Sequence, residues 1–353
     1  MENGKRKIAV ISTGNGGQSL AAYFANMGRS VALYAREQER IDMFQSNRFT
    51  LGGLFDCAPV VDLISCDMGE VVRDAYLIMV TTPAQYHPIV AKAMAPHLRD
   101  GQLVVLNPGR TFGTYVFDKT LKESGCAAQV VLGETDTFVF TCRCKEPGRP
   151  IIFEIKHDVK VAGHRRADTP LLTAALSELF PSIAPAKSVL ETGLTNIGMI
   201  FHPLPILMNI TRIEAKEEFR YYHDGISPLV AHVLERLDAE RVAVARAIGV
   251  EVPSAYQWLG ARYGSAGEDL YARIQNTAAY GKVMAPTEID TRYIHEDIQT
   301  GCVPVSCLGR WLNVKTDITD ASVKWASVVY NCDFYATGRN ERAVDFGAVL
   351  AEA

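Results

Sequence analysis

An alternation between short apolar runs and longer helix-like segments in the first half of the chain most constrains the fold. The four runs are KIAVIS at 7–12, SVALYA at 30–35, AYLIMVTT at 75–82 and QLVVLN at 102–107. Continuous apolar runs of this length are typical of strands buried on both faces of a parallel sheet. The intervening segments are long enough for crossover helices, so the alternation predicts an α/β doubly wound (Rossmann) domain. Further strand-like runs between 128 and 164 are expected to extend this sheet.

The second half of the chain has helical periodicity and no obvious strand-rich run after residue 190. Its clearest helix candidate is 226–250, with Ser227 as N-cap and Pro228 at the first helical position. Shorter helices are expected at 254–263, 267–276 and 317–330. We therefore predict two domains, a dinucleotide-binding Rossmann domain at 1–185 and an all-α substrate domain at 186–353.

The composition is that of an ordinary soluble globular protein. The 353 residues are 48% hydrophobic and 22% charged with a net charge of −4, so no basic surface favours a nucleic-acid partner. The first apolar run is far shorter than a signal sequence or membrane span requires, and we expect a cytoplasmic protein without membrane association. The eight cysteines show no zinc-site spacing and are expected to be reduced thiols, so no metal is predicted.

A glycine-rich turn, STGNGG, directly follows the first apolar run and opens a helix-like segment. Aligned on G-x-G-x-x-G, it has Ser12 at the first position, Gly14 at the second and Gly17 at the third. Gly14 would let the backbone approach a pyrophosphate, and Gly17 would let the helix pack closely on the strand. The turn predicts a dinucleotide site, and the alternative is a glycine-rich turn kept for packing alone. The residues expected around the dinucleotide are Gly14, Asn15, Gly16, Gly17, Thr82, Pro83 and Asn107, the last three at the carboxyl ends of the third and fourth strands.

The residues after the second strand bear on the choice between NAD and NADP. NAD-binding domains place an acidic residue there to bind the ribose 2′-hydroxyl, whereas this chain has Ala35 followed by Arg36, with Arg40 four residues on. An arginine fork would bind a 2′-phosphate and a carboxylate would repel it. We therefore predict NADP(H), with NAD as the alternative if Glu37 accepts the ribose hydroxyl instead.

The segment NIGMIFHPLPILMN at 196–209 is apolar nearly throughout, yet His202 lies at its centre. Thr195, His202 and Asn209 are spaced by seven residues and would share one face of a helix. The Pro-x-Pro that follows the histidine removes two backbone donors and predicts a kink. Two interpretations stay open, a hydrogen-bonded core histidine and a polar stripe that lines a cleft.

The most polar part of the second half is DTRYIHEDIQTG at 290–301. Either Asp297 or Glu296 would accept a hydrogen bond from Nδ1 of His202, which would leave Nε2 to exchange a proton with a substrate. Arg292 has the fork geometry that binds a carboxylate through two parallel hydrogen bonds. The alternative for this segment is a solvated surface turn.

A series of short motifs occurs in a fixed order along nearly the whole chain. They are GNGG at 14–17, NPG at 107–109, GET at 133–135, FTCR at 140–143, HPLP at 202–205, YY..GI.P at 221–228, DAER at 238–241, TRY..ED...G at 291–301 and LGR at 308–310. On these motifs the chain resembles the opine dehydrogenase family of the octopine/nopaline dehydrogenase type, and most closely its bacterial members that act on neutral amino acids.

The resemblance implies a reaction and a set of site residues. The reaction is reductive condensation of an L-amino acid with an α-keto acid, expected to be pyruvate, through an imine to an opine, with NAD(P)H as reductant. The resemblance places acid–base catalysis on His202 and Asp297 and carboxylate recognition on Arg292, and it places Glu134 near the amino-donor site. The further substrate-binding candidates are Tyr222, Thr195 and Asn209. We also expect a homodimer.

Two other functions stay open at this point. One is an enzyme of the same architecture that reduces C=O, such as a ketopantoate-reductase-like or 2-hydroxy-acid dehydrogenase. The other is a dinucleotide-sensing module without catalysis, which would have no use for a histidine, an arginine and an aspartate placed together.

Overall fold

The computed structural model describes residues 6–351 and divides them into two compact units. The α/β unit contains the described residues up to Gly109 together with Gly113–Thr192, and the helical unit contains Arg110–Phe112 and everything described from Gly193 on. The predicted boundary was residue 185. The α/β unit continues to Thr192 because the side chains of Glu191 and Thr192 bind Lys160 and Glu134 of that unit.

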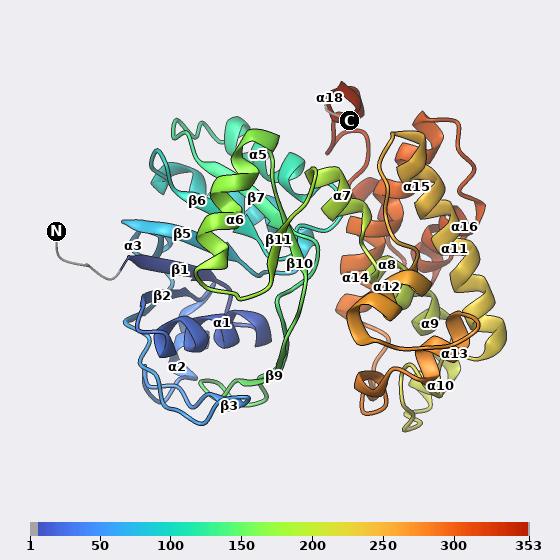
Figure 1. Cartoon of the computed structure of the whole chain (residues 1–353), viewed down its shortest axis with the longest axis horizontal. Helices are drawn as coiled ribbons and strands as arrows, with labels where there is room; N and C mark the ends of the chain where they lie inside the picture. Colours follow the sequence, from blue (N-terminus) through green and yellow to red (C-terminus); the bar gives the residue numbers. More distant parts are fainter. Residues whose placement is uncertain (1–5, 352–353) are drawn as a thin grey trace. The chain divides into compact units, whose positions relative to one another are not determined.

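The α/β unit is built on an eight-stranded sheet of order β11-β10-β7-β6-β5-β1-β2-β4 (Figure 1). Its strands are β1 (Lys7–Ile11), β2 (Ser30–Tyr34), β4 (Leu63–Ser65), β5 (Ala75–Val80), β6 (Leu103–Leu106), β7 (Val131–Thr135), β10 (Val159–Gly163) and β11 (Ile183–Pro185). All neighbouring strands are parallel except β7 and β10. The four runs that predicted a parallel sheet are β1, β2, β5 and β6, and the predicted α/β class is confirmed.

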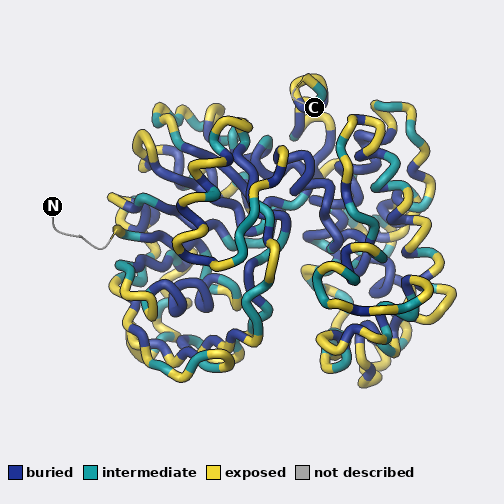
Figure 2. The backbone as a smooth tube through the Cα atoms, in the orientation of Figure 1, coloured by how far each residue is buried: buried dark blue, intermediate teal, exposed yellow. Residues whose placement is uncertain are grey.

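Alternate residues of the central strands face two different cores, which is why these strands have no polar face. Ile8 and Val10 of β1 belong to one core, and Ala9 and Ile11 belong to the other. Figure 2 shows the central strands dark blue, the colour of buried residues. The helices of this unit are α1 (Asn15–Asn26), α2 (Gln38–Asp42), α3 (Met68–Val72), α4 (His87–Met94), α5 (Gly113–Glu123) and α6 (Thr169–Ser177), while α7 (Val189–Leu194) runs from this unit into the helical one. Burial of one large aliphatic side chain contributes about 1.5–3 kcal/mol to the stability of the fold. The two cores together therefore hold the central strands, and with them the strand ends, in place.

The strand-like runs after residue 128 divide between two sheets. Two of them are β7 and β10 of the main sheet. The others are β8 (Phe140–Arg143) and β9 (Ile151–Ile155), which form a separate three-stranded sheet with β3 (Gly52–Gly53). The expectation that all of these runs extend the main sheet was therefore wrong for β8 and β9.

The helical unit contains no strand of either sheet among its described residues. Its helices are α8 (Gly198–Phe201), α9 (Pro203–Met208), α10 (Ile210–Glu214), α11 (Pro228–Ala247), α12 (Ala255–Tyr263), α13 (Leu270–Gln275), α14 (Arg292–Asp297), α15 (Val303–Trp311), α16 (Asp317–Val329), α17 (Phe334–Thr337) and α18 (Phe346–Ala351). As predicted, Ser227 caps α11, and its side chain accepts a hydrogen bond from the Val230 N–H. Within residues 6–351 no helix has the length and apolarity that a membrane crossing needs.

A buried ion pair on α11 accounts for the DAER motif. Arg241 is fully buried and binds Asp238 one turn earlier. Arg241 also donates to the carbonyls of Leu194 and Pro253, while Asp238 accepts from the Ala255 N–H at 2.6 Å. The pair satisfies backbone groups of two other segments, at Leu194 and at Pro253–Ala255, so its role is structural.

Candidate active site

His202 lies at a break between two short helices. Helix α8 ends at Phe201 and α9 begins at Pro203, so the break predicted from the Pro-x-Pro is confirmed. The His202 N–H still donates to the Gly198 carbonyl at 3.0 Å, whereas Pro203 at the start of α9 has no N–H and needs no acceptor. The backbone of His202 is therefore held between the end of α8 and the start of α9.

Two contacts fix the imidazole itself. Its Nδ1 lies 2.7 Å from Oδ2 of Asp297, the last residue of α14. Its ring stacks on Tyr293 with centroids 4.1 Å apart and planes 7° from parallel. Because Nδ1 faces the buried carboxylate of Asp297, a neutral His202 carries its proton on Nδ1 and leaves Nε2 as a base.

Glu296 binds two arginines and does not contact His202 in the described hydrogen bonds. Its Oε2 accepts from Nη1 of Arg292 at 3.2 Å, and its Oε1 lies 3.4 Å from Nε of Arg110. Arg110 also approaches Oδ1 of Asp297 at 3.6 Å. Of the two carboxylates that the sequence offered as partners of His202, the structure pairs the histidine with Asp297.

Arg110 is a site residue that the sequence reasoning missed. Burial alone would lower the pKa of its guanidinium, but the adjacent carboxylates of Glu296 and Asp297 raise that pKa above its ordinary value. Arg110 is therefore a permanent positive charge beside the pair. Its only signal in the sequence is its position directly after the NPG motif.

Glycine at 198 is required by the approach of α8 to this cluster. A Cβ on Gly198 would lie 2.3 Å from Oδ1 of Asp297 and 2.6 Å from Nη1 of Arg110. A π-helical turn, Ile298–Cys302, follows Asp297, and a Cβ on its Gly301 would lie 2.6 Å from Cβ of Met199. Two glycines on facing elements thus permit the close contact that brings Asp297 to His202.

A group of aromatic side chains adjoins the histidine. Tyr222 stacks on Tyr280 at 3.9 Å and meets Phe201 edge-on at 6.4 Å. Tyr221 packs against Tyr222 and donates its hydroxyl to the His202 carbonyl at 2.8 Å. Burial raises the pKa of Tyr222 and of Tyr280 well above the ordinary value, so both phenols are neutral. The predicted site residue Tyr222 is therefore part of an uncharged aromatic surface beside the histidine.

The remaining polar residues predicted in the helical unit behave differently from His202. The amide of Asn209 donates to the carbonyls of Pro205 and Gly225 at 2.8 Å each, so it stabilises the bend between α9 and α10. Thr195 is buried just before α8. The seven-residue spacing does not continue as one helical face because the chain changes helix at 202 and again at 209.

Glu134 lies in the α/β unit and is fully buried. Its carboxylate accepts from the Thr192 hydroxyl at 2.7 Å and from the Thr114 N–H at 3.1 Å. A Cβ on Gly109 would lie 2.1 Å from its Oε2. These contacts account for the GET and NPG motifs by packing within this unit.

The glycine-rich turn of the α/β unit has the geometry that a dinucleotide needs. Ser12 adopts a φ of 151°, a conformation that glycine adopts more readily, and its Oγ accepts from the Gly14 N–H at 3.0 Å. A Cβ on Gly17 would lie 1.8 Å from the Ser12 carbonyl oxygen. Helix α1 begins at Asn15 with no side-chain hydrogen bond at its cap, so its first N–H groups can bind an anion.

Buried polar atoms at the carboxyl ends of β5 and β6 also fit a dinucleotide. The hydroxyls of Thr81 and Thr82 and Nδ2 of Asn107 have no hydrogen-bond partner within the described chain. Such groups are costly unless a ligand or water satisfies them.

The residues predicted to bind the adenosine end of the dinucleotide contact their own neighbours in sequence. Arg36 is 75% exposed and pairs with Glu37, and Arg40 contacts Met43.

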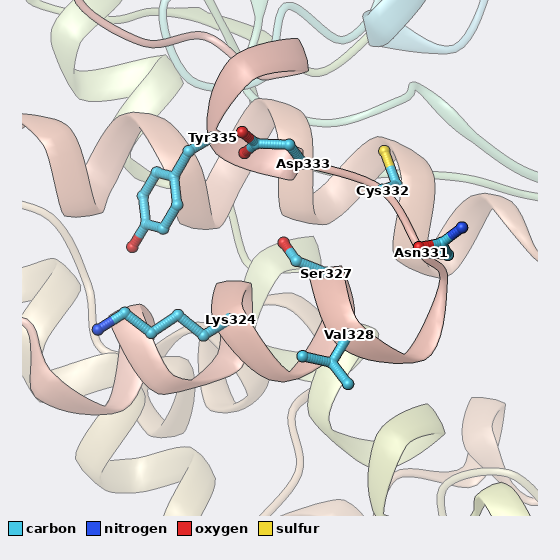
Figure 3. A pocket seen from close by; sticks show the side chains of 7 residues that line it. All are labelled: Lys324, Ser327, Val328, Asn331, Cys332, Asp333 and Tyr335. Atoms are coloured by element: carbon cyan, nitrogen blue, oxygen red, sulfur yellow. The ribbon is translucent and has the colours of Figure 1, made fainter.

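Figure 3 shows a surface hollow elsewhere in the helical unit. It is lined by Lys324, Ser327, Val328, Asn331, Cys332, Asp333 and Tyr335, from α16 and the segment after it. None of the predicted site residues is among them. The described residues also contain no group of His, Cys, Asp and Glu side chains arranged to hold a metal.

Comparison with known proteins accounts for both units. Residues 7–109 match the N-terminal model of NAD-dependent glycerol-3-phosphate dehydrogenase, and residues 185–330 match the α-helical domain of NAD/NADP octopine/nopaline dehydrogenase. The opine dehydrogenase of Arthrobacter sp. (strain 1C) is 37% identical over 349 residues, which are 98% of this chain and 97% of the relative. The chain belongs to the opine dehydrogenase family.

Solved structures agree with this assignment at the level of the fold. Octopine dehydrogenase bound to NADH and L-arginine superposes with a TM-score of 0.82 at 21% identity, covering 99% of this chain and 98% of that one. Yersinopine dehydrogenase bound to NADP+ gives 0.76 at 15% identity, covering 100% and 98%. The enzyme is thus an NAD(P)-dependent oxidoreductase that condenses an amino acid reductively with an α-keto acid, as the sequence predicted.

Proposed function

We propose that His202 is the general acid and base of this reaction, that Asp297 holds and balances it, and that Arg292 binds the keto acid. The 2.7 Å contact between Nδ1 of His202 and the buried carboxylate of Asp297 carries this proposal. The side chain of Arg292, from the same helix as Asp297, is 54% exposed and so remains accessible to a substrate carboxylate. Pyruvate is the proposed keto acid, since an octopine dehydrogenase structure was solved with pyruvate bound.

The proton transfers follow from this arrangement. Nε2 of His202 takes a proton from the substrate ammonium, and the neutral amine then attacks the keto carbonyl carbon. The carbinolamine loses its hydroxyl as water when the imidazolium returns that proton, which leaves a C=N bond. The nicotinamide supplies the hydride that reduces this bond when the dinucleotide is bound. Asp297 stays ionised and stabilises each imidazolium.

We propose that the amino-acid substrate is neutral. The group of uncharged aromatic rings beside His202 includes Phe201, Tyr222 and Tyr280. Rings of this kind favour apolar side chains over charged ones. An amino acid with an aliphatic or aromatic side chain is therefore the expected donor.

We propose NADP(H) as the preferred cofactor. Ala35 follows β2 at the position where NAD-binding domains place an acidic residue, and the next residue is Arg36, whose side chain is mostly exposed. Arg40 adds a second positive charge on α2. The ion pair between Arg36 and Glu37 would open to bind a 2′-phosphate, which carries more charge than one carboxylate.

We further propose a cytoplasmic homodimer. All eight cysteines are free, which is the usual state in a reducing compartment. Leu54, Ile151 and Phe153 are exposed around the strand pair β3 and β9, where a second copy would cover them. Light scattering after size exclusion measures this directly, and a monomer at micromolar concentration would contradict it.

Oxidation of NADPH tests the reaction as a whole. The assay uses pyruvate with a panel of neutral, basic and acidic amino acids, and mass spectrometry identifies the product. We expect oxidation only when both substrates are present, with neutral amino acids giving the highest kcat/KM. Equal rates with pyruvate alone would instead indicate reduction of C=O.

A further inference from the structure

A row of charged side chains of alternating sign connects the histidine to Arg292. From His202 it passes to Asp297, then to Arg110, Glu296 and finally Arg292. Arg110 is the central member and the only one within 4 Å of both carboxylates. In the described contacts, Arg110 forms no hydrogen bond or ion pair with the imidazole of His202 or with Arg292.

We propose that Arg110 is a positioning residue that holds Asp297 and Glu296, sets the charge beside His202 and thereby adjusts the pH at which the enzyme works. The inference rests on the proposed acid–base role of His202. Three observations carry it: the ion pairs of Arg110, the tethering of its backbone and the balance of charge in the cluster.

The tripeptide Arg110–Phe112 is the only piece of the chain's first half that belongs to the helical unit among the described residues. Thr111 anchors it, with its N–H on the Thr300 carbonyl at 3.1 Å and its hydroxyl on the Gly193 carbonyl at 2.8 Å. Arg110 and Phe112 on either side both have a φ of 60°, in the left-handed region. Non-glycine residues persist there only when surrounding contacts hold them.

The guanidinium end of Arg110 is held as firmly as its backbone. Oδ1 of Asn196 accepts from Nη1 at 3.2 Å, while Nδ2 of the same Asn196 donates to the Thr111 hydroxyl at 3.3 Å. Oδ1 of Asp297 has no hydrogen-bond partner in the described chain, so the guanidinium at 3.6 Å is the nearest charge that compensates this oxygen. Arg110 thus compensates an otherwise isolated buried atom.

The charges around His202 determine the direction of the expected pH shift. Asp297 and Glu296 favour the imidazolium form of His202, and Arg110 and Arg292 oppose it. The aromatic neighbours Tyr293 and Tyr221 are phenols, and burial raises the pKa of Tyr221 well above its ordinary value, so that this phenol stays neutral. Cys302 on the π-turn is likewise neutral because burial raises the pKa of its thiol. On α11, which packs against α8 and α9, Asp238 and Arg241 neutralise each other.

Removing the charge of Arg110 and removing the charge of Glu296 should shift the acid limb of the pH profile in opposite directions. In Arg110→Met, two carboxylates remain without their shared cation, so the acid limb of kcat/KM should move up by about one pH unit. In Glu296→Gln, the charge of Arg110 acts on Asp297 alone, and the acid limb should move down. We expect kcat in Arg110→Met to fall about 10- to 100-fold, because Asp297 loses its position.

The experiment measures kcat/KM for pyruvate and the amino acid from pH 5 to 10 for the wild type and both variants. Arg241→Met is the matched control, since it removes a buried arginine from another carboxylate pair on the same unit. It should lower the melting temperature and leave the pH profile unchanged. If Arg110→Met does not fold, the profile of Glu296→Gln decides alone.

An acid limb that stays in place in Arg110→Met, or moves up in Glu296→Gln, would overturn the proposal. The variant His202→Ala is measured alongside to separate two kinds of failure. If His202→Ala retains activity, the acid–base assignment fails. If His202→Ala is inactive while Arg110→Met and Glu296→Gln keep the wild-type profile, only the role of Arg110 fails.

Discussion

The two units of this enzyme build their sites in different ways. In the α/β unit, the candidate dinucleotide site consists of one turn and the ends of adjacent strands, so its residues are close in sequence or follow the sheet order. In the helical unit, the cluster around His202 combines segments near residues 110, 196–202 and 292–297. A local motif reveals the first kind of site, whereas the second is complete only when the fold brings Arg110 to the segments that carry His202 and Asp297. The division also predicts that cofactor binding and proton transfer can be damaged separately.

Removal of the imidazole should have the largest effect. His202→Ala is expected to lower kcat/KM by about 10²- to 10⁴-fold, the usual contribution of general acid–base catalysis. The dissociation constant for NADPH should remain unchanged because His202 lies outside the α/β unit. Steady-state kinetics and fluorescence titration measure the two quantities, and activity within threefold of the wild type would refute the assignment.

Two glycine-to-alanine changes compare the units directly. A Cβ at position 17 would meet the Ser12 carbonyl oxygen at 1.8 Å, so Gly17→Ala should weaken NADPH binding by about 10-fold or more, since a crowded backbone must shift. A Cβ at position 198 would meet Asp297 at 2.3 Å, so Gly198→Ala should lower kcat by about 10- to 100-fold and leave NADPH binding intact.

The control for this pair is Gly52→Ala, where the added Cβ would be 3.7 Å from Ile151. That distance is ordinary van der Waals contact, and the control should match the wild type in both assays. If Gly17→Ala and Gly198→Ala produced the same pattern of losses, the proposed separation of the two sites would be wrong.

Arg292 should affect one substrate more than the other. Arg292→Ala is expected to raise KM for pyruvate about 10- to 100-fold, the worth of a bidentate charged hydrogen bond, with little change in KM for NADPH. Arg292→Lys should restore little, since an ammonium group does not match the two carboxylate oxygens. Unchanged substrate KM values in Arg292→Ala would make it a surface arginine.

The smallest expected effect concerns the cofactor's 2′-phosphate. Arg36→Ala should reduce kcat/KM with NADPH by about 10-fold while kcat/KM with NADH stays constant, because one exposed charged contact is lost. Arg40→Ala should reduce kcat/KM with NADPH by less, since Arg40 lies four residues after Arg36, within α2. A variant Arg36→Ala that keeps the full NADPH preference would place the recognition elsewhere.

The sequence predicted most of the fold and about half of the candidate site. Apolar runs and a glycine turn are local signals, and they located β1, β2, β5 and β6 and the start of α1. His202 stood out because a polar group interrupts an apolar helix. Arg110 and Tyr293 did not, because their roles depend on tertiary contacts that no spacing encodes.

Some residues predicted to bind substrate make structural hydrogen bonds within their own unit. The sequence does not distinguish such residues from residues that contact a substrate. Asn209 lies seven residues after His202, yet its amide satisfies backbone carbonyls at a bend. Glu134 is a buried carboxylate that binds a hydroxyl and an N–H of its own unit. A buried polar side chain needs hydrogen-bond partners whether or not it meets a substrate, so the residue type alone cannot separate the two cases.

The central claim is that an aspartate–histidine pair of the helical unit carries proton transfer while the α/β unit binds the cofactor. Asp297→Asn tests it most directly, because the substitution keeps the shape of the side chain and removes its charge. The account predicts a loss of about 10²- to 10⁴-fold in kcat, with the KM values and the NADPH dissociation constant nearly unchanged, since an amide cannot balance the imidazolium. A kcat within threefold of the wild type, or a loss that appears only in NADPH binding, would contradict it.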